Sequence, residues 1–235
     1  MKCKIICLKE SNISVQNTKD CMQQAKKFNI EVEIFNAIDG RDSKKHFDEL
    51  KIKKKWNFKD GGNIGIDGCF LSHFYLWKEC LEYNIPYLIL EHDGYFIQKL
   101  PDDILNKFID VLKLDHLDPY SFYYNEQLES YKNLNNSVID YYNDYSKQTH
   151  LHETGSYLRG AYSYIIKPSG AKKLIDRVYD KGYLPADCQI GNSIVDIKVC
   201  IPTIVRLHPI YSINKNMLDL STTRNLLKHI TEEKI

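Results

Sequence analysis

The sequence lacks several features that define other classes of protein. No stretch approaches the roughly 20 apolar residues that cross a bilayer, and the apolar run at the N-terminus is too short for a signal peptide. No glycine-rich phosphate loop is present. Neither sign of charge dominates, because 32 Lys and Arg balance 31 Asp and Glu. We therefore expect a soluble, cytoplasmic protein with no nucleic-acid partner and no transmembrane segment.

The seven cysteines lack the spacing of a zinc site or of a disulfide framework. They are scattered along the chain, and no CxxC pair occurs. A zinc site is therefore not predicted from their spacing. The odd count and the missing framework favour free thiols in a reducing compartment.

The order of the expected elements indicates an α/β protein. A strand at 3–8, a helix at 18–28 and a strand ending at Asn36 would open an α/β sheet. Residues 41–63 are basic and irregular, which favours an irregular segment on the surface. Further expected helices lie at 68–83, from Pro101, from Pro168 to Lys181 and in the tail 218–235, and further strands lie from Pro86, at 157–166 and at 199–207. No repeat or linker divides the chain, so we predict a single domain over 1–235 with a core at about 3–210.

Two acids follow the apolar run that begins at Pro86. Glu91 and Asp93 are separated by one residue, and alternate side chains of a strand point the same way. Their carboxylates would then face one spot, and the ring of His92 would face away. Hard divalent cations prefer oxygen ligands and often share them with substrate phosphates. The pair predicts a metal–diphosphate site, although acids after a strand also serve as ordinary turn or surface residues.

Four blocks of sequence, taken in order, resemble glycosyltransferase family 25. This family includes bacterial lipooligosaccharide galactosyltransferases and collagen galactosyltransferases. The resemblance covers roughly residues 3–210. Its blocks are Asn36 to Gly40, the run 65–77 with Gly68, Cys69, Leu71, Ser72, His73 and Trp77, the apolar strand ending in Glu91-His92-Asp93, and 160–174 with Ala161, Tyr162, Gly170 and Ala171.

The resemblance implies a fold and an activity. The fold is a GT-A-like nucleotide-binding mixed sheet flanked by helices, with its site at the carboxyl ends of the strands. The activity is inverting transfer of a hexose, most plausibly galactose, from a UDP-sugar to a saccharide or glycosylated acceptor in glycan biosynthesis. Mn²⁺ or Mg²⁺ would neutralise the leaving diphosphate. Glu91 and Asp93 would bind this metal, and His208 would complete its shell.

The resemblance also suggests residues for the nucleotide sugar and for the acceptor. Asp39 and Gly40 could meet the uracil or ribose, or could simply form a turn. Ser72 and His73 could contact the nucleotide or the acidic loop, or could be a buried polar pair that orders the neighbouring strand. Arg159 could bind donor or acceptor, and Glu91 would face the diphosphate. Asp187, in the segment Pro185-Ala186-Asp187, is the expected general base, and its alternative role is to cap a helix.

The chain departs from the family pattern at two places. His92 stands where the family usually has Asp, and the Asn-Leu and Arg that usually follow the first strand are missing after Cys7. These departures leave a second hypothesis, a catalytically impaired relative that binds nucleotide sugar or glycan. A third hypothesis is a nucleotidyltransferase or another α/β nucleotide-binding protein that uses the same acid pair.

Overall fold

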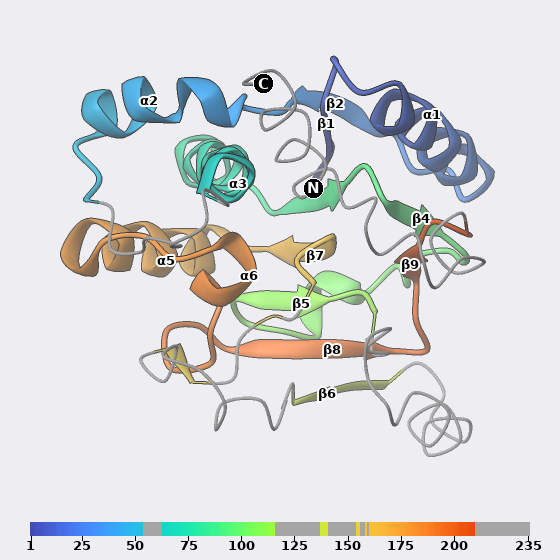
Figure 1. Cartoon of the computed structure of the whole chain (residues 1–235). Coiled ribbons are helices and arrows are strands. Elements are labelled where there is room, and N and C mark those ends of the chain that lie inside the picture. Colours follow the sequence, from blue (N-terminus) through green and yellow to red (C-terminus); the bar gives the residue numbers. More distant parts are fainter. Residues whose placement is uncertain (54–62, 116–136, 141–153, 156–157, 159, 210–235) are drawn as a thin grey trace.

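A mixed β-sheet lies at the centre of the fold (Figure 1). The computed structural model describes residues 1–53, 63–115, 137–140, 154–155, 158 and 160–209. Within these residues, seven strands are ordered β2-β1-β3-β7-β5-β8-β6, and β4 and β9 pair separately. The strands are β1 (Lys2–Cys7), β2 (Glu33–Asn36), β3 (Tyr87–Glu91), β4 (Gly94–Phe96), β5 (Val111–Lys113), β6 (Ser137–Asp140), β7 (Ser163–Ile166), β8 (Ile197–Ile201) and β9 (Val205–Leu207).

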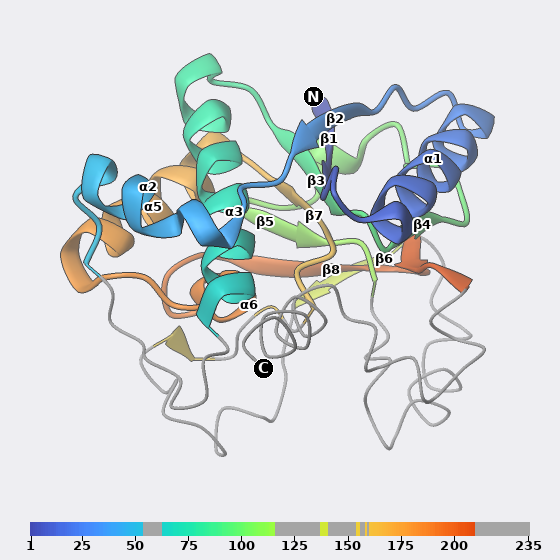
Figure 2. The same cartoon turned by 45° about the horizontal axis from the view of Figure 1, so that its top comes forward.

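Helices flank this sheet on both faces. The helices are α1 (Asn12–Lys27), α2 (Ser43–Leu50), α3 (Asn63–Tyr83), α5 (Pro168–Lys181) and α6 (Ala186–Gln189), with short 3₁₀ turns η1 (Gly40–Asp42) and η2 (Ile104–Asn106). In Figures 1 and 2, α2, α3, α5 and α6 group on one side, and α1 lies away from them beside β4. The expected mixed α/β sheet flanked by helices is confirmed.

Five strands of the sheet run in the same direction. β1 is parallel to β2 and to β3, whereas β7 is antiparallel to both β3 and β5, and β8 is parallel to β5. The carboxyl ends of β1, β2, β3, β5 and β8 therefore share one edge of the sheet. Glu91 closes β3 at this edge, paired with Ile6 of β1. Ligands of open α/β sheets bind outside this edge.

Alternate residues of β3 serve two separate apolar cores. Tyr87 and Ile89 pack in the core that contains α3 and α5, whereas Leu88 and Leu90 pack in the core that contains α1. This continuous burial is the usual pattern of a strand covered on both faces. α3 is buried around most of its circumference, through Phe70, Leu71, Phe74, Leu76 and Trp77. The two elements that carry the predicted site are thus held by the interior of the protein.

Glycines let the chain after β2 lie directly against α3. A Cβ at Gly40 would lie 1.7 Å from the carbonyl oxygen of Ile64, and a Cβ at Gly68 would lie 2.6 Å from the carbonyl oxygen of Ile38. Any side chain at either position would force the two segments apart. The pair fixes the loop that carries Asp39 against α3.

Three expected elements are wrong in detail. The helix expected from Pro101 is only the turn η2, because the apolar residues Val111 and Leu112 pair as β5 between β7 and β8. The supposed irregular stretch 41–63 begins with η1 and α2. The single strand expected at 199–207 is divided between β8 and β9, which belong to different sheets. The expected helical tail at 218–235 lies outside the described residues.

Other elements agree more closely with their expected positions, although the strand expected at 157–166 is limited to β7 (Ser163–Ile166) among the described residues. α5 runs from Pro168 to Lys181 as predicted, with proline at its first turn, where the missing amide hydrogen costs nothing. Ser169 does not cap it, however, because Lys167 holds the N-cap position and the Ser169 hydroxyl binds Asp110 instead. α1 begins at Asn12, earlier than expected, because the Ser11 hydroxyl caps it by accepting the Ser14 amide.

Candidate active site

The predicted acid pair spans the end of a strand and the turn after it. Glu91 is the last residue of β3, and His92 and Asp93 form the turn that leads to β4. The alternation of strand side chains therefore does not apply to Asp93, and that argument for the pair is wrong. The two carboxyl groups still interact electrostatically, because Glu91 contributes to the pKa of Asp93.

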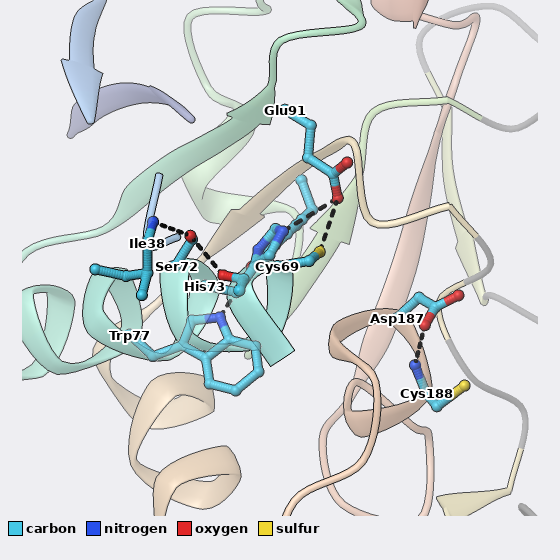
Figure 3. A network of polar contacts seen from close by, with 10 residues as sticks. Ile38, Cys69, Ser72, His73, Trp77, Glu91, Asp187 and Cys188 are labelled. Carbon is cyan, nitrogen blue, oxygen red and sulfur yellow. Dashed lines mark hydrogen bonds and ion pairs between the residues drawn. The ribbon is translucent and has the colours of Figure 1, made fainter. Parts of the chain in front are cut away.

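The Glu91 carboxylate faces two side chains of α3 (Figure 3). His73 Nε2 lies 3.1 Å from Glu91 Oε1, and Cys69 Sγ lies 3.9 Å from the same oxygen. Burial alone would raise the pKa of Glu91, but the hydrogen bond donated by His73 and the further electrostatic interaction with this ring outweigh burial and hold the pKa below its usual value. The Glu91 side chain remains 25% exposed. It can thus be both oriented by the protein and reached by a ligand.

His73 is held from its other side by the protein interior. Its Nδ1 lies 2.8 Å from the hydroxyl of Tyr164, which also accepts a hydrogen bond from Trp77 Nε1 at 2.8 Å. Indole N–H can only donate, so the arrangement that uses every proton has the Tyr164 hydroxyl donating to Nδ1. His73 Nε2 then carries the hydrogen that is donated to Glu91. The chain Trp77–Tyr164–His73 therefore fixes the direction of the Glu91 carboxylate.

Asp93 has a carboxylate oxygen without a partner. Its Oδ1 is buried and has no hydrogen bond within the part of the chain that the structure describes. Burial, followed by the charge of Glu91, raises the pKa of Asp93 to about 8. Buried polar atoms are almost always satisfied in folded proteins. An unsatisfied carboxylate oxygen beside a second carboxyl group is an arrangement that suits a divalent cation. The residues present therefore fit a metal ion.

The backbone of His208 contacts Asp93, whereas its ring points to other residues. The His208 amide donates to the Asp93 carbonyl oxygen at 2.6 Å. Its imidazole Nε2 lies 3.2 Å from Asp20 Oδ2 of α1, and its ring meets Tyr95 edge-on at 5.2 Å. The ring would have to leave Asp20 to join the acid pair, so its predicted role as a metal ligand stays a prediction.

The predicted nucleotide residues are engaged in contacts within the protein. The Asp39 carboxylate accepts hydrogen bonds from the Arg41 amide and guanidinium, at 2.8 Å for the amide. Ser72 is fully buried, donates to the Gly68 carbonyl and accepts the Ile38 amide at 2.9 Å. These contacts favour structural roles, a turn for Asp39 and a tie between α3 and the loop after β2 for Ser72.

Asp187 lies on α6, to the right of Glu91 in Figure 3. Its Oδ1 accepts the Cys188 amide at 2.9 Å. The N-cap position of α6 is Pro185, so Asp187 does not have the capping role considered as its alternative. Burial is the largest cause that raises the pKa of Asp187, and Glu91 adds to it. A carboxylate with a raised pKa is a stronger base than an ordinary Asp.

A sequence comparison identifies the family. The model of glycosyltransferase family 25, described as an LPS biosynthesis protein, matches residues 3–190. The chain belongs to glycosyltransferase family 25. The mixed sheet flanked by helices agrees with the α/β class expected for this family from the sequence. No curated protein matches this family 25 glycosyltransferase.

Two solved structures share a distant likeness with this glycosyltransferase. Mouse xyloside xylosyltransferase 1 in its apo form is 9% identical, with 81% of this chain and 80% of that chain covered and a TM-score of 0.41. A glycosyltransferase involved in the glycosylation of the major capsid of PBCV-1 is 8% identical, with 75% and 67% covered and a TM-score of 0.35. Likeness at this level carries no argument about donor or acceptor.

Two further findings bear on the expectations from the sequence. Among the helices that the structure describes, none combines the length and the apolar composition that a membrane crossing requires. All seven cysteines of this glycosyltransferase are free thiols, as expected. Arg159, predicted to bind donor or acceptor, lies outside the described residues.

Reasoning from the sequence missed the residues that orient Glu91. Tyr164, Trp77 and Cys69 all lie in the blocks that resemble the family, but their sequence positions predict no role in the site. One signal was available: Cys69 and His73 are four residues apart, a spacing that places both on one face of a helix. The hydroxyl of Tyr164 could not be found in this way, since 91 residues separate it from His73.

Proposed function

We propose that this family 25 glycosyltransferase transfers a hexose, with galactose as the first candidate, from a UDP-sugar to a saccharide or glycosylated acceptor. The proposed transfer inverts the anomeric configuration and depends on Mn²⁺ or Mg²⁺. The observation that carries the proposal is the buried oxygen of Asp93 beside Glu91, which has no partner among the described residues and lies at the carboxyl edge of the sheet.

Glu91 and Asp93 would hold the metal. The carboxylates of Glu91 and Asp93 repel each other when both are ionised. A divalent cation would remove that repulsion and give Asp93 Oδ1 a partner that it lacks among the described residues. When bound, the metal would neutralise the negative charge that develops on the leaving diphosphate. His73 would keep Glu91 turned toward this site through the hydrogen bond at 3.1 Å.

Asp187 would act as the base for the acceptor. Its carboxylate would take the proton of the acceptor hydroxyl as that oxygen bonds to the anomeric carbon and the bond to the UDP oxygen breaks. Direct displacement from the opposite face inverts the configuration. The raised pKa of Asp187, which is caused mainly by burial, supports this role.

The decisive experiment pairs Asp93→Asn with a screen of UDP-sugars for Mn²⁺-dependent turnover. We expect the variant to lose most of its turnover and to bind UDP more weakly in Mn²⁺, because the amide removes a charge that faces the diphosphate. Its circular dichroism spectrum should match that of the wild type. Asp180→Asn, an exposed acid at the end of α5, is the matched control. Wild-type turnover in Asp93→Asn would show that the acid pair is structural.

An impaired relative that binds nucleotide sugar or glycan is the alternative function. The observation that favours it is His92, which stands in place of the usual Asp and is 6% exposed beside Glu91. Measurable Mn²⁺-dependent turnover of any UDP-sugar would exclude it.

We also propose a cytoplasmic location, which the seven free thiols support because such a set is typical of a reducing compartment.

A further inference from the structure

Three different ligand atoms meet at the base of the predicted site. The Cys69 sulfur, one His73 ring nitrogen and one Glu91 oxygen all lie within 4.8 Å of one another. The nitrogen-to-oxygen distance is 3.1 Å and the sulfur-to-oxygen distance is 3.9 Å. Around a tetrahedral Zn²⁺, such ligand atoms would lie about 3.4–3.6 Å apart. The two measured distances therefore lie on either side of the spacing that a tetrahedral ion requires.

We propose that Cys69, His73 and Glu91 form a binding site for a thiophilic divalent cation of the Zn²⁺ or Co²⁺ class. This site is distinct from the Glu91–Asp93 site for a hard cation. A thiolate and an imidazole select borderline and soft metals, whereas Mg²⁺ prefers oxygen ligands alone. Three protein ligands leave a fourth position open for water or for a substrate oxygen.

Two rigid elements hold these ligands in place. Cys69 and His73 occupy successive turns of one face of α3, which is buried in the larger core. Glu91 ends β3, whose preceding residues are fully buried. A site on a helix and a strand keeps its geometry better than a site on loops. The ligands therefore approach one another without any ordering of the chain.

The surroundings of the three ligands suit a cation. The Tyr164 hydroxyl lies 2.8 Å from His73 Nδ1 and provides the outer partner that metal-bound histidines usually have. Cys69 and Glu91 are both partly exposed, which gives an ion a path of entry. The carboxylate of Glu91 places negative charge beside the Cys69 sulfur. A thiolate and a carboxylate together match the charge of a divalent ion.

Binding of the ion would displace the thiol proton of Cys69 and the hydrogen on His73 Nε2. The Cys69 thiol proton passes to water as sulfur bonds to the metal. The hydrogen on His73 Nε2 is exchanged for one on Nδ1, which then donates to the oxygen of Tyr164. The imidazole thus changes tautomer but not charge, and one proton leaves the protein for each ion that binds.

Occupancy of this site would compete with the proposed transfer reaction. Glu91 belongs to both sites, so an ion held by Cys69 and His73 withdraws it from Asp93. On the proposed function, a thiophilic cation therefore inhibits Mn²⁺-dependent transfer. This consequence rests on that function, but the binding site itself does not.

Titration of the full-length protein with Co²⁺, without nucleotide, tests the site directly. We expect a thiolate-to-cobalt charge-transfer absorption that saturates at one ion per chain and disappears when Zn²⁺ is added. Cys69→Ser should abolish this absorption, and Glu91→Gln should weaken Co²⁺ binding roughly 10-fold or more. Cys200→Ala and Asp93→Asn are the controls and should keep the absorption. An absent band in the wild type, or a band that survives in Cys69→Ser, would overturn the proposal.

Two further measurements extend the test, and the first of them depends neither on the folding of a variant nor on catalysis. In the wild type, nitrogen chemical shifts should show the His73 ring changing tautomer when Zn²⁺ binds, and an unchanged ring would count against the site. Added Zn²⁺ should lower the turnover of the wild type but not that of Cys69→Ser, with each protein compared with its own zinc-free rate. If no transferase activity is found, the cobalt spectrum still decides the site. If activity is found without the band, the site fails and the proposed function stands.

Discussion

The carboxylate of Glu91 is positioned by a chain of three buried side chains. Trp77 fixes the hydroxyl of Tyr164, this hydroxyl fixes the ring of His73, and the ring holds Glu91. Each member is buried, so each hydrogen bond forms in a medium of low dielectric, where losing it is costly. Asp93 has no such support for its Oδ1 among the described residues. The contrast assigns Glu91 a fixed direction and leaves Asp93 as the group that a cation would satisfy.

The role of Asp187 can be tested by a change that keeps its hydrogen bond. In Asp187→Asn, the amide oxygen can still accept the Cys188 amide hydrogen, so the melting temperature should stay close to that of the wild type. The amide is not a base, so kcat should fall by roughly 10²–10⁴-fold. The affinity for UDP-sugar, measured by calorimetry, should change little. A lowered melting temperature with near-normal kcat would remove Asp187 from the mechanism.

Ser72 should matter for stability and not for nucleotide binding. Its hydroxyl is fully buried and joins the Ile38 amide to the Gly68 carbonyl. Ser72→Ala leaves that amide without its partner, so we expect a loss of about 1–3 kcal/mol in the free energy of unfolding. Urea denaturation measures this loss, and calorimetry with UDP should give an unchanged affinity. A weakened UDP affinity at unchanged stability would restore the nucleotide contact that the sequence suggested.

At the scale of elements, Asp110 links three of them. It lies just before β5 and binds both α5 and the residue that precedes β8. Its buried carboxylate accepts hydrogen bonds from Ser169 and Lys173 of α5, and from the Asp196 amide just before β8, which lies at 2.9 Å. Burial alone would raise the pKa of Asp110, but these bonds outweigh burial and lower it. The folded protein therefore holds the proton of Asp110 less tightly than the unfolded chain does.

The lowered pKa of Asp110 makes the stability of the protein fall in acid. Because the folded pKa lies below the unfolded value of about 3.9, the contribution of Asp110 is complete above that pH and is lost as pH falls through the folded pKa. Asp110→Asn should therefore be less stable than the wild type at neutral pH, and the difference should shrink in acid. Urea denaturation over this range measures it. Asp176→Asn, an exposed acid on α5, should cost little at any pH.

At the scale of the whole molecule, two cores share one sheet. Since β3 contributes alternate residues to both, neither core can lose its packing without disturbing the strand that carries Glu91. The family match over residues 3–190 includes residues of both cores. The single-domain organisation predicted from the sequence is consistent with this sharing and stays a prediction.

Scanning calorimetry tests the prediction of one domain. We expect one cooperative unfolding transition whose calorimetric and van't Hoff enthalpies agree. Mn²⁺ and UDP together should raise its midpoint, since a ligand at 100 times its Kd stabilises the native state by about 2.7 kcal/mol. Asp93→Asn should show a smaller rise. Two separate transitions would divide the chain into independent units.

The sequence alone determined the family, the α/β class and the strand that ends in Glu91. These depend on local patterns: ordered motif blocks, apolar runs and the proline and glycine that bound α5. Local pattern was misleading where pairing with distant strands decided the outcome. Ile104 and Leu105, with Val111 and Leu112, have a helical spacing, yet pairing with β7 and β8 makes Val111 and Leu112 part of β5.

Only the tertiary structure decided how the site is arranged. It placed Asp93 in a turn, directed the His208 ring to Asp20 at a sequence separation of 188, and brought Cys69 and His73 to Glu91. Each of these residues is ordinary by itself, and the contact exists because the packing of α3 on the sheet brings distant segments together. A single sequence records the residues that can act, whereas their distances, burial and partners are set by the packing of the whole chain.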